Sequence, residues 1–220
     1  MKAPPDRLPL LLLGALTLLT GFVDAVSFLR FGHVFVANMT GNIVFLGFAF
    51  AGARDISIPG SLVALVAFLL GALLGGRFIR RHGDAQYRLL FVTTATKIVL
   101  IGVATLSLWL LGAGDGSRYL VTALLGISMG LQNAAVRKVG IPDLTTTVLT
   151  MTLTGIAADS SLAGGTNPRL GRRVTSVLVM FLGALIGGAL VLHVSATAAL
   201  TAAFVVLLVV FAVSGVVSSR

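Results

Sequence analysis

The sequence predicts an all-α integral membrane protein, and three observations lead to this fold class. Hydrophobic residues make up 57% of the 220 positions and charged residues only 10%, with a mean hydropathy of +1.05. A soluble chain carries about 25% charged residues, so water cannot be the main solvent of this surface. Apolar runs of about twenty residues, the length that crosses a bilayer as a helix, follow one another with short connections. We expect one membrane domain over residues 1–220 and no soluble domain.

Charged residues, glycines and prolines divide the chain into eight apolar segments. The segments cover residues 8–29, 34–53, 58–76, 89–112, 119–136, 144–163, 174–192 and 196–217. Basic residues precede the first segment, as they do in a secretory signal. Because its apolar run continues past the usual signal length, an uncleaved first helix is the expected reading.

An internal repeat is predicted, with one half at about 8–112 and the other at about 119–217. The clearest match sets FLLGALLGG at 68–76 against MFLGALIGG at 180–188. Two further matches set Gly21 and Asp24 against Gly130 and Asn133, and Thr40 near Thr150. The three offsets are close and drift in one direction, as a gene duplication would produce.

The basic residues bear on how many segments span. If all eight span with the N-terminus inside, the inside loops hold eight Lys and Arg residues and the outside loops seven. Short cytoplasmic loops normally carry a clear excess of basic residues, so this balance counts against eight spans.

A six-span alternative separates the charges. If segments two and six enter and leave on the same face, twelve basic residues gather inside, and only Arg30, Arg54 and Arg118 remain outside. Each half then crosses three times, so the halves become inverted repeats. We therefore expect six full spans, two re-entrant or broken helices, and both termini in the cytoplasm, with eight spans as the alternative.

Segments two and six carry the most polar groups. The first holds Asn38, Thr40 and Asn42 around a glycine, and the second holds a threonine run that includes Thr147 and Thr150. Irregular backbone at membrane depth survives where protein or a water-filled cavity satisfies it. These residues are predicted to bind a small solute, although Asn and Thr also join membrane helices to one another.

Five further polar residues lie inside or near the ends of apolar segments. Asp24 in segment one and Gln132 with Asn133 in segment five are candidate solute ligands, and Asp24 also suits a cap or an ion pair. Asp159 and Lys97 are possible buried charges, and the Lys97 stem has the alternative of reaching the membrane surface.

Glycine pairs predict close helix packing in segments three and seven. Gly71 with Gly75, and Gly183 with Gly187, form small-xxx-small faces. The spacing leaves open whether these faces meet within one chain or form a homo-oligomer.

Composition also limits the chemistry. There is no cysteine, so disulfides and thiolate ligands are excluded. The formal net charge of +9 comes from residues at segment ends, which suits membrane topology better than nucleic-acid binding. No recognisable catalytic or metal-binding motif appears, so we expect no enzyme, no cofactor and no metal site.

Several short motifs together resemble the YoaK family of bacterial membrane proteins. They are GFVDA at 21–25, VANMTGN at 36–42, GLQNA at 130–134 and the threonine run at 145–150. The likeness covers nearly the whole chain and implies a multi-pass protein of a bacterial cell membrane, but it supplies no substrate.

The residues themselves favour a transporter or channel for a small polar solute in the lipid bilayer. Inverted repeats with broken helices commonly place a binding site near the bilayer centre. A membrane scaffold without transport is the main alternative, and an intramembrane enzyme is a weaker one.

Overall fold

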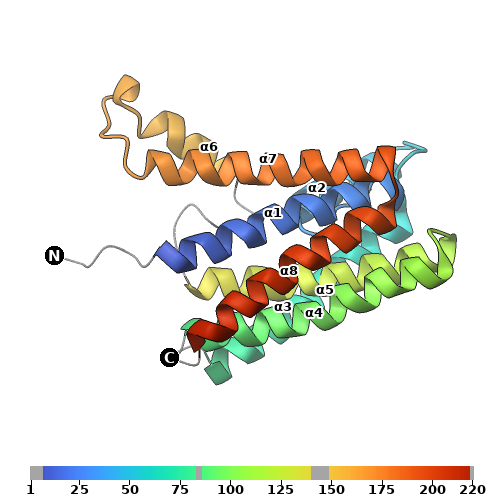
Figure 1. Ribbon diagram of the computed structural model, residues 1–220. Coiled ribbons are helices and arrows are strands. Elements are labelled where there is room, and N and C mark those ends of the chain that lie inside the picture. Colours follow the sequence, from blue (N-terminus) through green and yellow to red (C-terminus); the bar gives the residue numbers. More distant parts are fainter. Residues whose placement is uncertain (1–6, 83–85, 140–148, 219–220) are drawn as a thin grey trace.

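The structure is a computed structural model that describes residues 7–82, 86–139 and 149–218, and all regular structure in these ranges is helical (Figure 1). The bounds of its elements are α1 Arg7–Arg30, α2 Met39–Phe50, α3 Ile58–His82, α4 Gln86–Leu111, α5 Asp115–Val139, α6 Leu149–Ala158, the 3-10 turn η1 Ser161–Ala163, α7 Leu170–His193 and α8 Ala196–Ser218. The eight predicted segments therefore correspond to eight α-helices within the described residues, with ends shifted by a few positions.

Six of the described helices are long and apolar enough to cross a membrane, namely α1, α3, α4, α5, α7 and α8. The shortest of them, α8, has 23 residues, which at a rise of about 1.5 Å per residue gives roughly 35 Å. Helices α2 and α6 have only 12 and 10 residues. Over the residues that the structure describes, neither reaches across a hydrocarbon layer of about 30 Å, which agrees with six candidate spans in this part of the chain.

The long helices run alternately back and forth along the bundle, and both termini lie at the same end (Figure 1). The short helices α2 and α6 lie toward opposite ends, each beside the long helix that follows it. The segment 31–38 before α2 is non-helical, and α2 therefore starts inside the bundle, where Val36 and Ala37 are buried.

Two helix pairs, α3 with α5 and α1 with α7, pack at backbone distance through glycines. A Cβ added to Gly71 would lie 2.0 Å from the Ile127 carbonyl oxygen, and one added to Gly183 would lie 2.2 Å from the Leu18 carbonyl oxygen. One turn later, Gly75 faces α5 again and Gly187 faces α1 again. The predicted glycine faces therefore pack within one chain. The face of α3 packs against α5 and the face of α7 against α1, so the two faces do not meet one another.

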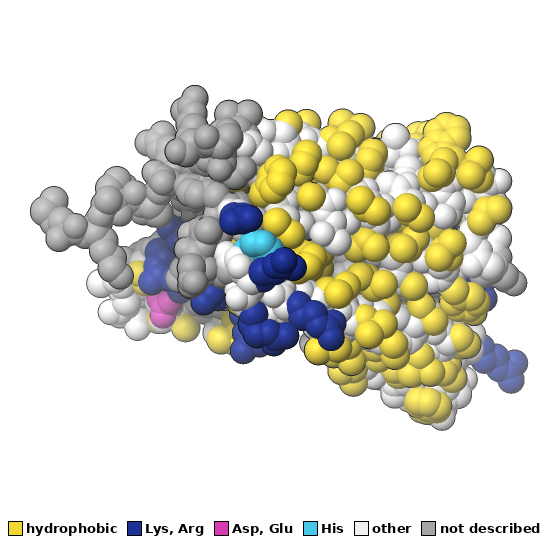
Figure 2. All heavy atoms as spheres, turned by 90° about the horizontal axis from the view of Figure 1, so that it is seen from below, with side chains coloured by type: hydrophobic (Ala, Val, Ile, Leu, Met, Phe, Trp, Pro, Cys, Tyr) yellow, Lys and Arg dark blue, Asp and Glu magenta, His cyan; other side chains and the backbone are white. Residues whose placement is uncertain are grey.

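The outside of the bundle suits a lipid environment. Large side chains on the outer faces are apolar and exposed, among them Leu69 on α3, Val99 on α4 and Leu185 on α7. Yellow apolar atoms cover much of the face in Figure 2, and most of the basic side chains gather toward one end. Arg80, Arg81, Arg137 and Lys138 end α3 and α5 at the side of the termini, whereas Arg30 ends α1 at the other side. Contact with the lipid bilayer follows from this surface.

Candidate functional site

The break before α2 is stabilised by a carboxylate on α1. Asp24 Oδ1 accepts hydrogen bonds from the backbone N–H groups of Val36 and Ala37, at 3.0 and 2.9 Å. These amides lie outside any helix, and leaving them unpaired in a buried position would cost free energy. Asp24 therefore allows the chain to remain non-helical at membrane depth.

Asn42 holds the same break from the other side. Its amide nitrogen donates to the Phe35 carbonyl oxygen at 2.6 Å, and its amide oxygen accepts from the Phe35 N–H at 2.9 Å. The Asn42 side chain is fully buried. The Asn38 side chain caps α2 by accepting from the Gly41 N–H at 3.3 Å. The polar motif of segment two thus builds its own irregular backbone.

A cavity of about 410 Å³ opens beside this break. Its described lining comes from α1, from the segment before α2, from the start of α6 and from α7. The lining residues are Asp24, Ala25, Phe28, Leu29, Phe35, Ala37, Asn38, Leu149, Thr150, Met180 and Ala184. Segments two and six, which are distant in sequence, therefore contribute polar side chains to one hollow.

The predicted solute ligands divide into two groups. Asp24, Asn38 and Thr150 line the cavity, Asp24 with a buried side chain and the other two with exposed ones. Thr40, on the first turn of α2, is exposed and does not line it. Asn42 lies outside the cavity because its amide is engaged with Phe35. Thr147 lies outside the described residues.

Gln132 and Asn133 lie elsewhere, on α5. Asn133 is half-buried and donates to the Met129 carbonyl oxygen of its own helix at 3.0 Å. Gln132 is fully buried and accepts a hydrogen bond from Lys97 Nζ. Its amide nitrogen donates to Thr20 Oγ1 on α1 at 3.1 Å. Lys97 is also fully buried, so its ammonium does not reach the membrane surface, and its partner is Gln132 rather than Asp24.

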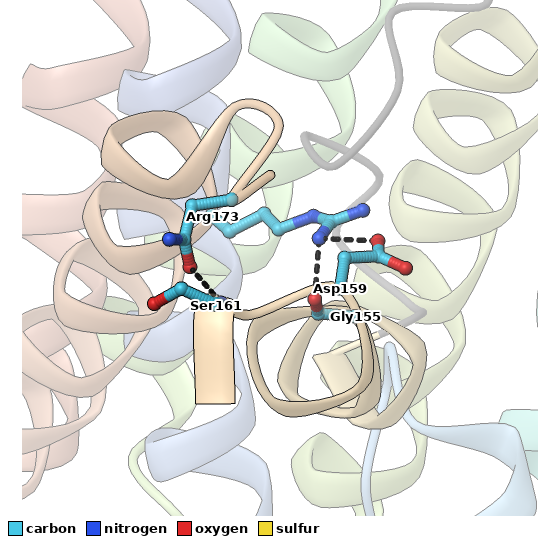
Figure 3. A network of polar contacts seen from close by, with 5 residues as sticks. Gly155, Asp159, Ser161 and Arg173 are labelled. Carbon is cyan, nitrogen blue, oxygen red and sulfur yellow. Dashed lines mark hydrogen bonds and ion pairs between the residues drawn. The ribbon is translucent and has the colours of Figure 1, made fainter. Parts of the chain in front are cut away.

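Asp159 lies at the end of α6 and pairs with α7 (Figure 3). Arg173 NH1 is 2.7 Å from Asp159 Oδ2 and also donates to the Gly155 carbonyl oxygen. The Asp159 side chain remains 44% exposed. In the following turn the Asn167 side-chain oxygen accepts from the Ser161 N–H at 3.3 Å. Asp159 is therefore part of a half-exposed clamp that fastens α6 to α7, at a distance from the cavity lining.

Sequence reasoning missed the aromatic wall of the cavity. Phe28 and Phe35 both line it, and their rings stack with centroids 4.9 Å apart. Phe28 follows Asp24 by four positions, the helical spacing that places two side chains on one face. That spacing was a usable signal, whereas Phe35 lies on non-helical backbone and gave none.

The described residues contain no group of three His, Asp or Glu side chains placed to hold a metal ion. The polar side chains among the described lining residues are one carboxylate, one amide and one hydroxyl. Such groups bind a solute by charge and hydrogen bonding.

Comparisons with known proteins agree with this architecture. Residues 12–213 match the family described as "Protein of unknown function (DUF1275)". The chain is similar to "UPF0700 transmembrane protein YoaK" of Bacillus subtilis (strain 168), with 36% identity over 156 residues. That match covers 68% of this chain and 66% of the relative, just under two thirds of its length. No solved structure matches. The resemblance inferred from the short motifs is confirmed, and the chain belongs to the DUF1275 family of multi-pass transmembrane proteins that includes YoaK.

Proposed function

We propose that the protein is a bacterial cell-membrane transporter or channel for a small polar solute, and that segments two and six line its path. One observation carries the proposal: Asn38 and Thr150, which belong to the two short broken segments, line a single cavity with Asp24. Irregular backbone within a membrane domain is tolerated where it is buried in protein or lines a water-filled cavity, and the break before α2 lies beside this cavity.

A helix end beside the cavity supports solute binding. Helix α2 begins there, since Asn38 caps α2 and also lines the cavity. The first turn of a helix has N–H groups without intrahelical partners and a partial positive charge. A helix start at such a hollow is typical of transporters that bind solute with discontinuous helices.

The proposal includes a duplication with the two halves inverted, and the glycine contacts support it. A Cβ on Gly21 would collide with the Met180 oxygen and the Ala184 nitrogen, and one on Gly130 with the Phe68 oxygen and the Ala72 nitrogen. The predicted repeat pairs these same positions: Gly21 with Gly130, Phe68 with Met180, and Ala72 with Ala184.

The glycines on the partner helices also meet residues that the predicted repeat pairs. Gly183 faces Leu18 and Gly71 faces Ile127, which the repeat also pairs. In Figure 1, α1 and α5 run in opposite directions, as an inverted repeat requires. The excess of basic residues at the end that holds both termini supports a cytoplasmic location for that end.

A vesicle assay tests the proposal. Purified protein in liposomes is given a panel of uncharged, cationic and anionic small solutes, and uptake is compared with that of protein-free vesicles. Thr150→Trp places a large ring at the cavity wall and is expected to reduce uptake to the protein-free level. Leu153→Trp adds the same ring to an exposed position of α6 outside the cavity lining, and should leave uptake unchanged.

Native protein that raises the uptake of no solute would refute transport. Equal uptake through the Thr150→Trp and Leu153→Trp variants would refute the proposed path.

A further inference from the structure

The described lining of the cavity contains one carboxylate and no basic side chain. Asp24 is only 6% exposed, and Oδ1 accepts both of its hydrogen bonds, from Val36 and Ala37. Within the described part of the chain, Oδ2 accepts none. The backbone amides thus fix one oxygen and leave the other for whatever occupies the cavity.

Lys97, the buried base of the described bundle, does not serve as the partner of Asp24. Its ammonium donates to Gln132 Oε1, in a network that continues to Thr20. Lys97 is absent from the cavity lining. A bound cation would stabilise the ionised form of a buried carboxylate that has no basic side chain beside it in the described lining.

The remaining walls suit an organic cation better than a bare metal ion. Phe28 and Phe35 line one side, and aromatic rings attract substituted ammonium groups through their quadrupole. Leu29 and Met180 offer apolar surface for alkyl groups. The cavity, at about 410 Å³, is many times the roughly 30 Å³ share of one water molecule, and the described residues supply it with a single carboxylate.

We infer that the cavity binds a small monovalent cation of the substituted-ammonium class, with Asp24 as its counter-charge and Phe28 and Phe35 as its aromatic wall. The inference rests on the proposed function, because it names the cargo of the same cavity.

The test compares two probes of the same shape on the full-length protein in detergent. Choline carries the positive charge, and dimethylbutanol replaces its nitrogen with an uncharged carbon. Calorimetry is expected to detect choline binding at least about tenfold tighter than dimethylbutanol binding. Asp24→Asn should weaken choline by about tenfold or more, whereas Asp55→Asn, the same change on an exposed loop residue, should not. Equal affinity for the two probes, or unchanged choline affinity in Asp24→Asn, would overturn the inference.

A second variant keeps the test decisive if Asp24→Asn fails to fold, since Asp24 also holds the backbone. Phe28→Leu removes the ring but keeps an apolar side chain, and should weaken choline by about threefold or more without changing dimethylbutanol affinity. Unchanged choline affinity in a folded Phe28→Leu protein would count against the aromatic wall and overturn the inference.

The vesicle panel separates this inference from the proposed transport. Choline binding without uptake of any solute would support the cation site and refute transport. Uptake of an uncharged solute that Thr150→Trp blocks, in a protein that binds no choline, would support transport and refute the cation site.

Discussion

Lys97 on α4 and Gln132 on α5 form a hydrogen-bonded pair in the middle of the bundle, and neither side chain has any exposed surface. Within the described residues, the Lys97 nitrogen donates to a single side-chain amide, that of Gln132. A lysine at this depth is costly unless its donors are satisfied, so each residue depends strongly on the other.

We therefore expect Gln132→Leu to destabilise the protein by about 2–3 kcal/mol, because it leaves the Lys97 ammonium without its partner. The double variant Lys97→Met with Gln132→Leu replaces both polar groups by apolar ones and should recover most of that loss. Thermal unfolding in detergent measures both. Additive losses in the double variant would show that the two residues are not coupled.

The topology prediction uses the absence of native cysteine. Single cysteines at Gln86, the first residue of α4, and at Thr166, in the connection from α6 to α7, should both react with an impermeant thiol reagent from the cytoplasmic side. A cysteine at Ala53, before α3, should react from the opposite side. If Gln86 and Thr166 react from opposite sides, all eight segments span and the inverted arrangement is wrong.

Close packing at the glycine faces gives a matched stability test. Gly71→Ala brings a methyl group against the Ile127 backbone, which cannot move aside as a side chain can, and should cost about 1–3 kcal/mol. Gly183→Ala should cost a similar amount, since the proposed repeat pairs the two positions. Gly76→Ala is the control, because nothing lies within 4 Å of its added carbon. Equal stability of the Gly71→Ala and Gly76→Ala proteins would contradict the packing argument.

The clamp between α6 and α7 predicts a local effect. Arg173→Gln removes the ion pair with Asp159 and weakens the contact to the Gly155 carbonyl oxygen. Because the pair is partly exposed, the loss of global stability should stay near about 1 kcal/mol. Hydrogen exchange should nevertheless accelerate over residues 155–167, with Arg172→Gln as the charge-matched control. Unchanged exchange there would mean that α6 is held by its other contacts.

Much of this fold follows from patterns that are local in the sequence. Apolar length fixed the membrane class and the basic residues favoured six spans, which agrees with the short α2 and α6. The amides around Gly41 marked segment two as irregular, because Asn38 and Asn42 offer the backbone partners that a helix would otherwise supply.

The contacts that the sequence does not predict depend on which helices become neighbours. Asn42 is equally suited to bind a solute or its own backbone, and only the three-dimensional approach of Phe35 decides between them. The partner of Lys97 lies 35 positions away on another helix, at a rotation that no spacing rule specifies. Asp24 was recognised as a candidate, but its contact with the segment before α2 requires that segment to fold back along α1.

The glycine contacts also determine when the bundle is completed during synthesis. Helix α3 can meet α5 only once the first helix of the second half has been made, and α1 can meet α7 only once most of that half has been made. The glycine-packed surfaces of α1 and α3 therefore have no partner within the first half. The bundle is completed only when helices of both halves pack together, and neither half forms the cavity by itself.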